Sequence, residues 1–439
     1  MNRNSRLQDT VSLIINLFLI WLITLIFRYY WYKDYHNLVY FYQIGNVFIL
    51  ILYYFCLYLF NKIYGGFNLG VSGVTDLLLS QTITVVLTNM VIYILSSFVY
   101  KGVIKIRGFL WIIFLEIIAF FVLDLLINRL YYHLFSPKST LLVYEGDYRR
   151  IYEKLVRYQN RSIKITDEIS IGDFNMSQYQ QSFPYECVII IGLSDKDKKM
   201  VSNFCYLNSI SLYEIPTLFD VILQNSTYIH LIDTPVFKMN RFGPDQVEKF
   251  IKRVFDIVFS AVLIVITSPI WLITAIAIKA YDGGPVFYCQ KRLTQYGKIF
   301  KIIKFRSMKI DAEKNGAQFA KENDDRITPV GKFIRSCRID EFPQLLNILA
   351  GDMSVVGPRP ERPEIVEQIK SELPEFDFRL KVKAGLTGFA QVYGKYNTDL
   401  KDKLLLDMMY IENYSIMLDL RIILMTIKTV FVKDSTEGV

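Results

Sequence analysis

Histidine is scarce in this chain of 439 residues, which contains only His36, His133 and His230. None of them lies beyond residue 230, so the C-terminal part of the chain has no imidazole of its own. Serine–histidine and cysteine–histidine catalysis both depend on an imidazole base. These mechanisms are therefore excluded for the C-terminal part, and any catalysis there must rely on other side chains.

Cysteine is sparse as well, and its spacing is irregular. The chain has no Cys-x-x-Cys pair, and its five cysteines are scattered, namely Cys56, Cys187, Cys205, Cys289 and Cys337. Such spacing indicates neither a disulfide framework nor a zinc site. We interpret all five as reduced thiols.

A glycine-rich nucleotide fingerprint is missing from the middle of the chain. The apolar runs Thr140–Tyr144 and Cys187–Gly192 predict two buried strands of a small, doubly wound α/β unit. Only Gly146 follows the first run, where a dinucleotide-binding turn requires three glycines at fixed spacing. We expect a degenerate Rossmann-like domain over residues 138–234 that binds no nucleotide cofactor.

Apolar residues are abundant, at 52% of the chain, while charged residues make up 21%. The mean hydropathy of +0.27 suits neither an ordinary soluble enzyme nor a protein wholly within lipid. Two or three units, part membrane and part aqueous, are expected for this length. Four long apolar segments occupy the first third, roughly Val11–Phe27, Leu38–Phe60, Leu77–Tyr100 and Phe109–Leu134.

Each of these segments approaches the roughly 20 residues that a helix needs to cross the hydrocarbon layer. Tyrosine and tryptophan gather at their ends, as membrane interfaces favour. We therefore predict four transmembrane helices within residues 1–137, the first retained as an anchor because no signal-peptide cleavage site follows it. Basic residues flank both ends of the segments, so the positive-inside rule does not fix the topology.

The net charge of +8 accompanies these apolar segments and no nucleic-acid-binding module. Anionic lipid head groups and phosphorylated substrates are the expected partners, and nucleic acid is not. Residues 235–248 show no clear period and contain Gly243-Pro244, which predicts a linker. The last unit, residues 249–439, follows it.

This last unit opens with the apolar segment Val254–Ala280, which Thr267-Ser268-Pro269 interrupts. Pro269 removes a backbone donor and favours a bend. The sequence leaves two structures open: a fifth span, or a helix–break–helix hairpin over residues 252–280 that enters and leaves the same leaflet.

The adjacent carboxylates Asp340 and Glu341 shortly precede Pro343, and proline is favoured at the first position of a helix. A helix N-terminus stabilises negative charge and binds phosphate. An aspartate there can attack a phosphoryl group, and its neighbour can hold a divalent cation. Basic residues suited to neutralising a diphosphate flank the pair, namely Lys304, Arg306, Arg335, Arg338 and Arg359.

Each of these features alone has an ordinary structural explanation. An Asp-Glu pair before a helix is usually a cap, and an arginine near a carboxylate is usually in a surface ion pair. Taken together and in order, the motifs closely resemble the bacterial sugar transferase family, the monotopic polyprenyl-phosphate phosphoglycosyl transferases. The resemblance covers about residues 249–433 and rests on Lys304–Met308, Arg335–Gln344, Gly351–Pro360, Gly385–Gln391 and Tyr410–Leu424.

The resemblance implies transfer of a hexose-1-phosphate, glucose or galactose by family association, from a UDP-sugar to undecaprenyl phosphate with release of UMP. Asp340 matches the nucleophile that forms a covalent aspartyl-phosphosugar, and Glu341 matches the Mg²⁺ ligand. Substrate-binding positions are also matched, by Lys304, Arg335, Arg359, Asp419 and, at a basic position associated with nucleotide binding, Lys395.

Four spans before a degenerate nucleotide fold resemble the long-form members, which initiate capsule, exopolysaccharide or O-antigen synthesis. The implied architecture is a four-helix membrane bundle, the α/β domain and an α-rich catalytic domain whose first helix is re-entrant at Ser268-Pro269. The catalytic domain would lie on the cytoplasmic face of the cytoplasmic membrane, as would the N-terminus, and a homodimer is expected from the long-form members.

One departure from the family pattern is Ala384-Gly385, where a proline–glycine pair is usual; we expect a looser loop that keeps its activity. Two rival functions were weighed, a polytopic phosphosugar transferase and a non-enzymatic scaffold or nucleotide-sugar sensor. The small number of spans argues against the first, and the intact Asp340-Glu341 pair argues against the second.

Overall fold

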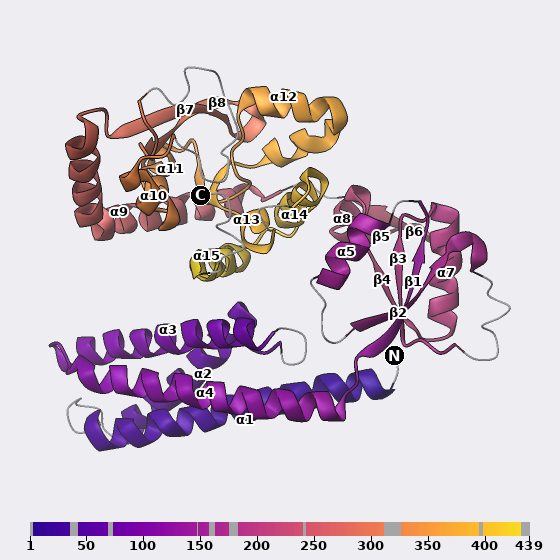
Figure 1. Cartoon of the computed structure of the whole chain (residues 1–439), viewed down its shortest axis with the longest axis horizontal. Coiled ribbons are helices and arrows are strands. Elements are labelled where there is room, and N and C mark those ends of the chain that lie inside the picture. The colour runs from indigo at the N-terminus through magenta and orange to yellow at the C-terminus, as the bar shows by residue number, and fades with distance from the viewer. Residues whose placement is uncertain are drawn as a thin grey trace. The chain divides into compact units, whose positions relative to one another are not determined.

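The computed structural model describes residues 3–35, 43–68, 73–146, 148–157, 163–174, 183–239, 243–310, 326–394 and 398–431. The chain divides into two compact units, Met1–Ile215 and Pro216–Val439 (Figure 1). This division places the residues that follow the parallel sheet with the C-terminal unit.

The first unit opens with four long helices, α1 (Arg3–Tyr30), α2 (Gln43–Tyr64), α3 (Val74–Tyr100) and α4 (Ile106–Leu134), with a short π-helical turn, η1 (Trp31–Tyr35), after α1. All four are long and apolar enough to cross a membrane, in agreement with the four predicted segments. The start of the second predicted segment, residues 38–42, lies outside the described residues. Buried aromatic rings pack between the helices, and Phe27 stacks on Tyr53 with 3.9 Å between ring centroids.

A parallel four-stranded sheet follows, with the strand order β2-β1-β3-β4. Its strands are β1 (Lys138–Tyr144), β2 (Ile163–Ser170), β3 (Cys187–Ile191) and β4 (Ser211–Glu214), with the short turn η2 (Ile171–Asp173) after β2. The two predicted strands are confirmed as β1 and β3. Helices α5 (Arg149–Arg157) and α7 (Asp195–Leu207) cover opposite faces (Figure 1). Leu141 packs with α7 and Leu142 with α5, because successive side chains point to opposite faces of a strand.

The second unit begins with α8 (Leu218–Gln224) and the antiparallel hairpin of β5 (Thr227–Leu231) and β6 (Thr234–Lys238). Here the structure differs from the predicted linker over residues 235–248, since β6 occupies its first part. Pairing with β5 makes this segment a strand, although its sequence shows neither the helical nor the strand periodicity of apolar residues. At the other end, Asp245 and Glu248 form a reciprocal capping box that starts the next helix.

That helix, α9 (Gln246–Asp282), is 37 residues long and contains Pro269. It is the fifth helix in the described part of the chain that is long and apolar enough to span a membrane. Its two halves run in different directions (Figure 1). Next to Pro269, Thr267 and Ser268 donate hydroxyl hydrogen bonds back to the carbonyls of Leu263 and Val265. Proline and such back-bonded hydroxyls both bend helices, so the bend lies at the predicted break.

The remaining elements of the second unit surround the functional motifs. They are β7 (Phe287–Leu293), η3 (Gln295–Gly297), β8 (Ile299–Phe305), α10 (Pro329–Ser336), η4 (Ile339–Glu341), α11 (Gln344–Ala350), β9 (Ser354–Val356), α12 (Pro363–Glu372), η5 (Pro374–Lys381), β10 (Gly385–Thr387), α13 (Phe389–Tyr393), α14 (Leu400–Glu412) and α15 (Ile416–Phe431). β7 and β8 pair antiparallel, while β9 and β10 pair parallel.

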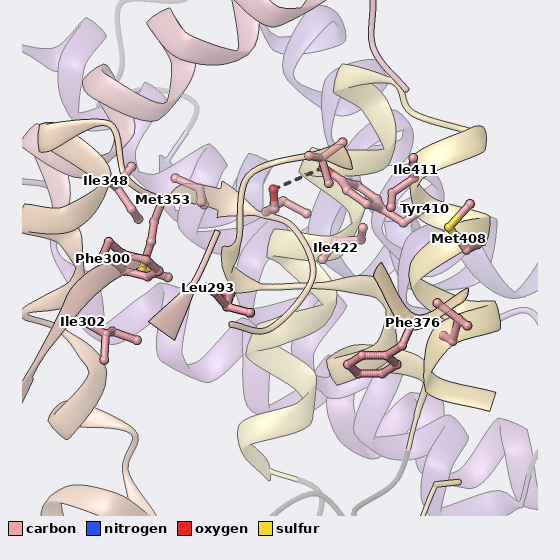
Figure 2. Close-up of a cluster of buried hydrophobic side chains, with 14 of the residues drawn as sticks. Leu293, Phe300, Ile302, Ile348, Met353, Phe376, Met408, Tyr410, Ile411 and Ile422 are labelled. Carbon is pink, nitrogen blue, oxygen red and sulfur yellow. Dashed lines mark hydrogen bonds between the residues drawn. The ribbon is translucent and has the colours of Figure 1, made fainter. Parts of the chain in front are cut away.

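One hydrophobic core joins most of these elements (Figure 2), while α10 and η4 pack in a second, smaller cluster around Phe305 and Ile334. Phe300 and Ile302 of β8 lie near Ile348 of α11 and Met353, while Phe376 of η5 lies on the side of α14 and α15. Short strands and helices cannot bury enough apolar surface by themselves. The shared core therefore fixes the loops between them, where the candidate site residues lie.

Asn347 ties α11 to the open edge of β8. Its Oδ1 accepts from the Ile303 amide at 2.9 Å, and its Nδ2 donates to the Lys301 carbonyl at 2.8 Å. We predict that Asn347→Leu lowers the free energy of unfolding by about 2 to 4 kcal/mol, because two backbone groups lose their partners in a buried place. Thermal unfolding in detergent checks this. Asn413→Leu, at an exposed position, is the matched control and should change little; equal losses would contradict the assignment.

Candidate active site

Asp340 and Glu341 lie in the 3-10 turn η4, between α10 and α11. The preceding residue, Arg338, has φ +57°, a left-handed conformation that costs energy for a residue with a Cβ. This turn reverses the chain after α10 and directs the Asp340 side chain inward, where it is 8% exposed.

The pair lies directly ahead of α11, near its N-terminus as predicted. Pro343 is the N-cap residue rather than the first helical residue, because α11 begins at Gln344. The amides of Glu341, Phe342 and Leu345 already donate to carbonyls three residues earlier. Because these amides are already bonded, they cannot donate to the two carboxylates. Basic side chains therefore supply the positive potential at the pair.

Glu341 receives two cations on one oxygen. Lys304 Nζ lies 3.2 Å and Arg359 Nη2 3.1 Å from its Oε1. Burial would raise the pKa of Glu341, but the charges of Lys304, Arg359 and Arg338 outweigh burial and hold the pKa well below its usual range. Burial correspondingly lowers the pKa of Lys304, and the charge of Glu341 raises that of Arg359. The Glu341 carboxylate is therefore ionised at any physiological pH.

Asp340 has the opposite electrostatics. Burial, followed by the charge of Glu341, raises its pKa to about 6, although Lys304, Arg335 and Arg338 act against this. No described residue donates a hydrogen bond to its carboxylate, in contrast to Glu341. Two adjacent carboxyl groups whose pKa values are driven apart are typical of acid, base or nucleophile pairs. An ionised Asp340 would be poorly solvated and free to attack.

Arg335 comes from the last turn of α10 and acts electrostatically on Asp340. Its Nη1 is buried and finds no hydrogen-bond partner among the described residues. A buried guanidinium nitrogen without a partner is costly unless an anion completes it. Arg335 is thus suited to bind a phosphate oxygen beside Asp340.

Arg306 does not belong to this cluster, contrary to the expectation from its position in the sequence. Its guanidinium forms a two-pronged ion pair with Asp282 at the end of α9, with Nη1 at 2.8 Å from Oδ2. A buried arginine that already has a bidentate carboxylate partner has little capacity for a phosphate. Its role is structural, because it fastens the end of α9 to β8.

Contacts made by the backbone at and near Arg359 fix the position of this residue. It follows β9, whose parallel pairing with β10 brings Gly357 so close to the neighbouring loop that a Cβ there would lie 2.4 Å from the Lys383 carbonyl oxygen. The carbonyl of Arg359 accepts from Arg379 Nη2 at 2.9 Å, and Arg379 pairs with buried Asp407 at 2.8 Å. Neither Arg379 nor Asp407 was singled out from the sequence.

The departure from the family pattern at Ala384 has a structural counterpart. The Ala384 amide donates to the Thr294 hydroxyl oxygen at 3.2 Å, a bond that a proline could not make. The Thr294 hydroxyl in turn donates to the Asp352 carbonyl at 2.7 Å. The loop is therefore tied by a hydrogen bond where a proline would restrict it through its ring.

Asp419 contacts α9 rather than the Asp340-Glu341 pair. Its Oδ2 lies 2.6 Å from Lys252 Nζ, and its Oδ1 accepts from the Tyr410 hydroxyl at 2.8 Å. Among the described residues, no contact joins Asp419 to the carboxylate pair. Lys395, the remaining predicted binding residue, lies outside the described residues.

The first half of α9 carries a polar face that sequence reasoning largely missed. Arg253 donates to the Ile348 and Leu349 carbonyls at the end of α11, at 2.6 and 2.8 Å. Asp256 accepts from the Ser354 hydroxyl and the Val355 amide of β9. A single aspartate inside an apolar segment was the available signal, because an unpaired charge there is costly.

The described side chains of the site can bind a divalent cation only if a substrate supplies further ligands. No group of three or more His, Cys, Asp or Glu side chains close enough to hold a metal occurs among the residues that the structure describes. However, both described bonds to Glu341 use Oε1, which leaves Oε2 facing no described donor. Mg²⁺ is usually held by one or two carboxylates plus substrate phosphates, so Glu341 fits a Mg²⁺ ion that arrives with a diphosphate.

Comparison with known proteins identifies the second unit. Residues 247–433 match the family model described as bacterial sugar transferase. A UDP-N-acetylgalactosamine-undecaprenyl-phosphate N-acetylgalactosaminephosphotransferase of Aeromonas hydrophila is 40% identical over 229 residues, covering 52% of this chain and 53% of the relative. A UDP-glucose:undecaprenyl-phosphate glucose-1-phosphate transferase of Klebsiella pneumoniae is 38% identical over 243 residues, covering 54% and 52%.

The match to these two relatives thus spans about half of their length. A putative undecaprenyl-phosphate N-acetylgalactosaminyl 1-phosphate transferase of Bacillus subtilis is 51% identical over 130 residues, which cover 30% of this chain and 73% of the relative. The family model covers the part of the chain that holds the motifs described above, and the chain belongs to the bacterial sugar transferase family.

Proposed function

We propose that this protein transfers a sugar-1-phosphate from a UDP-sugar to undecaprenyl phosphate, with Asp340 as the nucleophile. The observation that carries the proposal is the asymmetry of the pair: Asp340 is buried with a raised pKa and no described donor, while Glu341 is fixed by Lys304 and Arg359. Relatives named for this reaction with glucose and with N-acetylgalactosamine support it.

The reaction has two steps. In the first, an Asp340 oxygen forms a bond to the β-phosphorus of the UDP-sugar, the bond from that phosphorus to the bridging oxygen breaks, and UMP leaves with the bridging oxygen. In the second, an oxygen of undecaprenyl phosphate attacks the same phosphorus and releases Asp340. Division into two displacements lets one site serve a soluble donor and a lipid acceptor in turn.

The basic side chains divide the electrostatic work. Arg335 binds the transferring phosphate through its buried, unpartnered nitrogen, and its charge keeps Asp340 ionised. Lys304 and Arg359 hold Glu341 and offset the negative charge that develops on the diphosphate. Mg²⁺, held by Glu341 with the substrate, would supply further stabilisation of that charge.

The geometry of α9 favours a re-entrant helix in the cytoplasmic membrane over a fifth span. Its beginning is bonded to α11 and α15 through Arg253 and Lys252, and its end to β8 through Asp282 and Arg306. Both ends are thus fastened to the same domain, and the helix bends at Pro269 between them. With this arrangement the catalytic domain stays on one face, which we assign to the cytoplasm because nucleotide sugars are made there.

The donor sugar is glucose, galactose or, as the names of two relatives add, N-acetylgalactosamine. The test is UMP release by full-length protein in nanodiscs from a panel of UDP-sugars, with Mg²⁺ and undecaprenyl phosphate. Release with one or a few donors supports the proposal and identifies the sugar. No release from any donor by folded protein would favour the scaffold or sensor instead.

Asp340→Asn should lower the rate of transfer by at least about a thousandfold, because an amide cannot form the acyl phosphate. Wild-type protein given UDP-sugar without the lipid acceptor should release close to one UMP per chain in a burst, and the variant none. Asp377→Asn, which removes a partly exposed partner of Lys370, serves as the control and should retain activity. Robust turnover by Asp340→Asn would overturn the mechanism.

The rate of transfer should depend on pH through Asp340. Its pKa is raised to about 6, and only the ionised form attacks, so kcat/KM should rise as the pH increases through about 6 and level off above 7. A rate profile from pH 5 to 8 with saturating Mg²⁺ measures this. A flat profile in this range would show that a different group limits the reaction.

Replacement of Arg335 should affect both binding and this titration. Arg335→Ala removes a cation near Asp340, so KM for the UDP-sugar should rise about tenfold or more and the midpoint of the pH profile should move upward. Arg335→Lys should bring both the KM and the pH midpoint part of the way back to their wild-type values. Lys332→Ala, on the exposed side of α10, is the control. An unchanged pH midpoint in Arg335→Ala would reduce Arg335 to a structural residue.

A further inference from the structure

The four-helix bundle of the first unit has an unusually polar interior. Three helices each carry two buried polar residues spaced eight apart: Tyr53 and Asn61 on α2, Gln81 and Asn89 on α3, Glu116 and Asp124 on α4. Eight helical residues correspond to about 12 Å. The six side chains therefore form two polar layers inside the bundle.

In the first layer the carboxylate is fully paired. Glu116 accepts from the Tyr53 hydroxyl on Oε1 and from Asn89 Nδ2 on Oε2, both at 2.7 Å. Burial of a carboxyl group is tolerated when each oxygen has a donor. This layer needs no further ligand.

The second layer lacks donors. Asp124 is fully buried and accepts only from Gln81 Nε2, at 3.2 Å on Oδ1. Its Oδ2 has no hydrogen-bond partner among the described residues, and the same holds for Oε1 of Gln81 and Oδ1 of Asn61. Gln81 and Asn61 are each 1% exposed. This layer therefore holds three buried acceptor oxygens without a described donor, one from a carboxylate and two from amides.

The turn after α2 packs against both Gln81 and Asn61. Gln81 Nε2 also points to the Gly66 carbonyl, at 3.4 Å, and a Cβ on Gly66 would lie 2.1 Å from Asn61 Oδ1 and 3.3 Å from Gln81 Cγ. Asn16 of α1 reaches the same turn, where its Nδ2 donates to the Phe67 carbonyl at 3.0 Å and its Oδ1 is again unpaired. Asn128, one turn beyond Asp124, leaves both amide atoms unpaired.

A positive charge is missing from this layer. No lysine, arginine or histidine is buried in the described parts of α1 to α4. A carboxylate inside an apolar bundle is stable only if it is paired or neutralised. Carboxylate and amide oxygens are hard ligands that suit hard cations, and one carboxylate among neutral oxygens balances one positive charge.

We propose that Asp124, Gln81 and Asn61 form a binding site for a small monovalent cation of the Na⁺ type within the membrane bundle. Asp124 supplies the charge, and the amide oxygens of Gln81, Asn61 and Asn16 complete the oxygen ligands. The site joins all four helices, α1 to α4, so a bound ion stabilises the bundle. This proposal is independent of the transferase reaction.

The experiment measures thermal unfolding of the full chain in detergent, in NaCl and in N-methyl-D-glucamine chloride of equal ionic strength. Na⁺ should raise Tm saturably by a few degrees, since a ligand that binds only the folded state stabilises it. Asp124→Asn should abolish the difference. Glu116→Gln, which alters the fully paired layer of the same bundle, should retain it. Binding of ²²Na⁺ should reach one ion per chain.

Should Asp124→Asn fail to fold, Gln81→Met provides a milder change, and its half-saturating Na⁺ concentration should rise at least tenfold. The proposal is overturned if wild-type Tm is the same in both salts, or if Asp124→Asn keeps the full response. It is also overturned if lowering the pH stabilises the protein while Na⁺ does not, because a proton on Asp124 would then replace the cation.

Discussion

The polar face of the first half of α9 is the constraint on which the catalytic unit depends. Apolar side chains of this helix pack against the domain core, but lipid could bury them equally well, so specific polar bonds fix where the helix lies. Lys252, Arg253 and Asp256 provide those bonds to α15, α11 and β9 in turn. Two of these partner elements border the site: α11 follows Asp340 and Glu341, and β9 leads to Arg359. Removal of this face would leave buried charges without partners and separate the elements that carry the site.

The pKa values of the two neighbouring carboxyl groups in the site are shifted in opposite directions. Glu341 is satisfied and strongly ionised because two cations reach one of its oxygens. Asp340 has no donor among the described residues, and burial raises its pKa to about 6. Both follow from a single turn, in which the left-handed Arg338 directs one side chain toward Lys304 and Arg359 and leaves the other unbonded. The strain of that residue is offset by the apolar cluster of α10 and η4 around Ile334, and a site of this kind stores reactivity that a stable ion pair would remove.

The membrane bundle contains one buried carboxylate with described donors on both oxygens and one with a described donor on a single oxygen. Glu116 accepts from two neutral donors, one on each oxygen, whereas Asp124 accepts from Gln81 alone among the described residues and leaves its other oxygen unpaired. In both units, we assign a ligand to the carboxyl group with fewer described donors, a phosphoryl group for Asp340 and a small cation for Asp124. By contrast, Arg379 with Asp407 and Arg306 with Asp282 are buried charged groups that are held in structural ion pairs.

Sequence alone determined the apolar segments, the two central strands, the bend at Pro269 and the order of the motifs around Asp340 and Glu341, because these depend on local composition, hydrophobic period and residue type. It did not reveal β6, whose order comes from pairing with β5, nor the roles of Arg306 and Asp256, which depend on partners distant in the chain. Only the tertiary structure decided which basic residues face the carboxylate pair and which carboxylates lack donors. Residue type fixes what a side chain can bind, but folding decides which partner it meets.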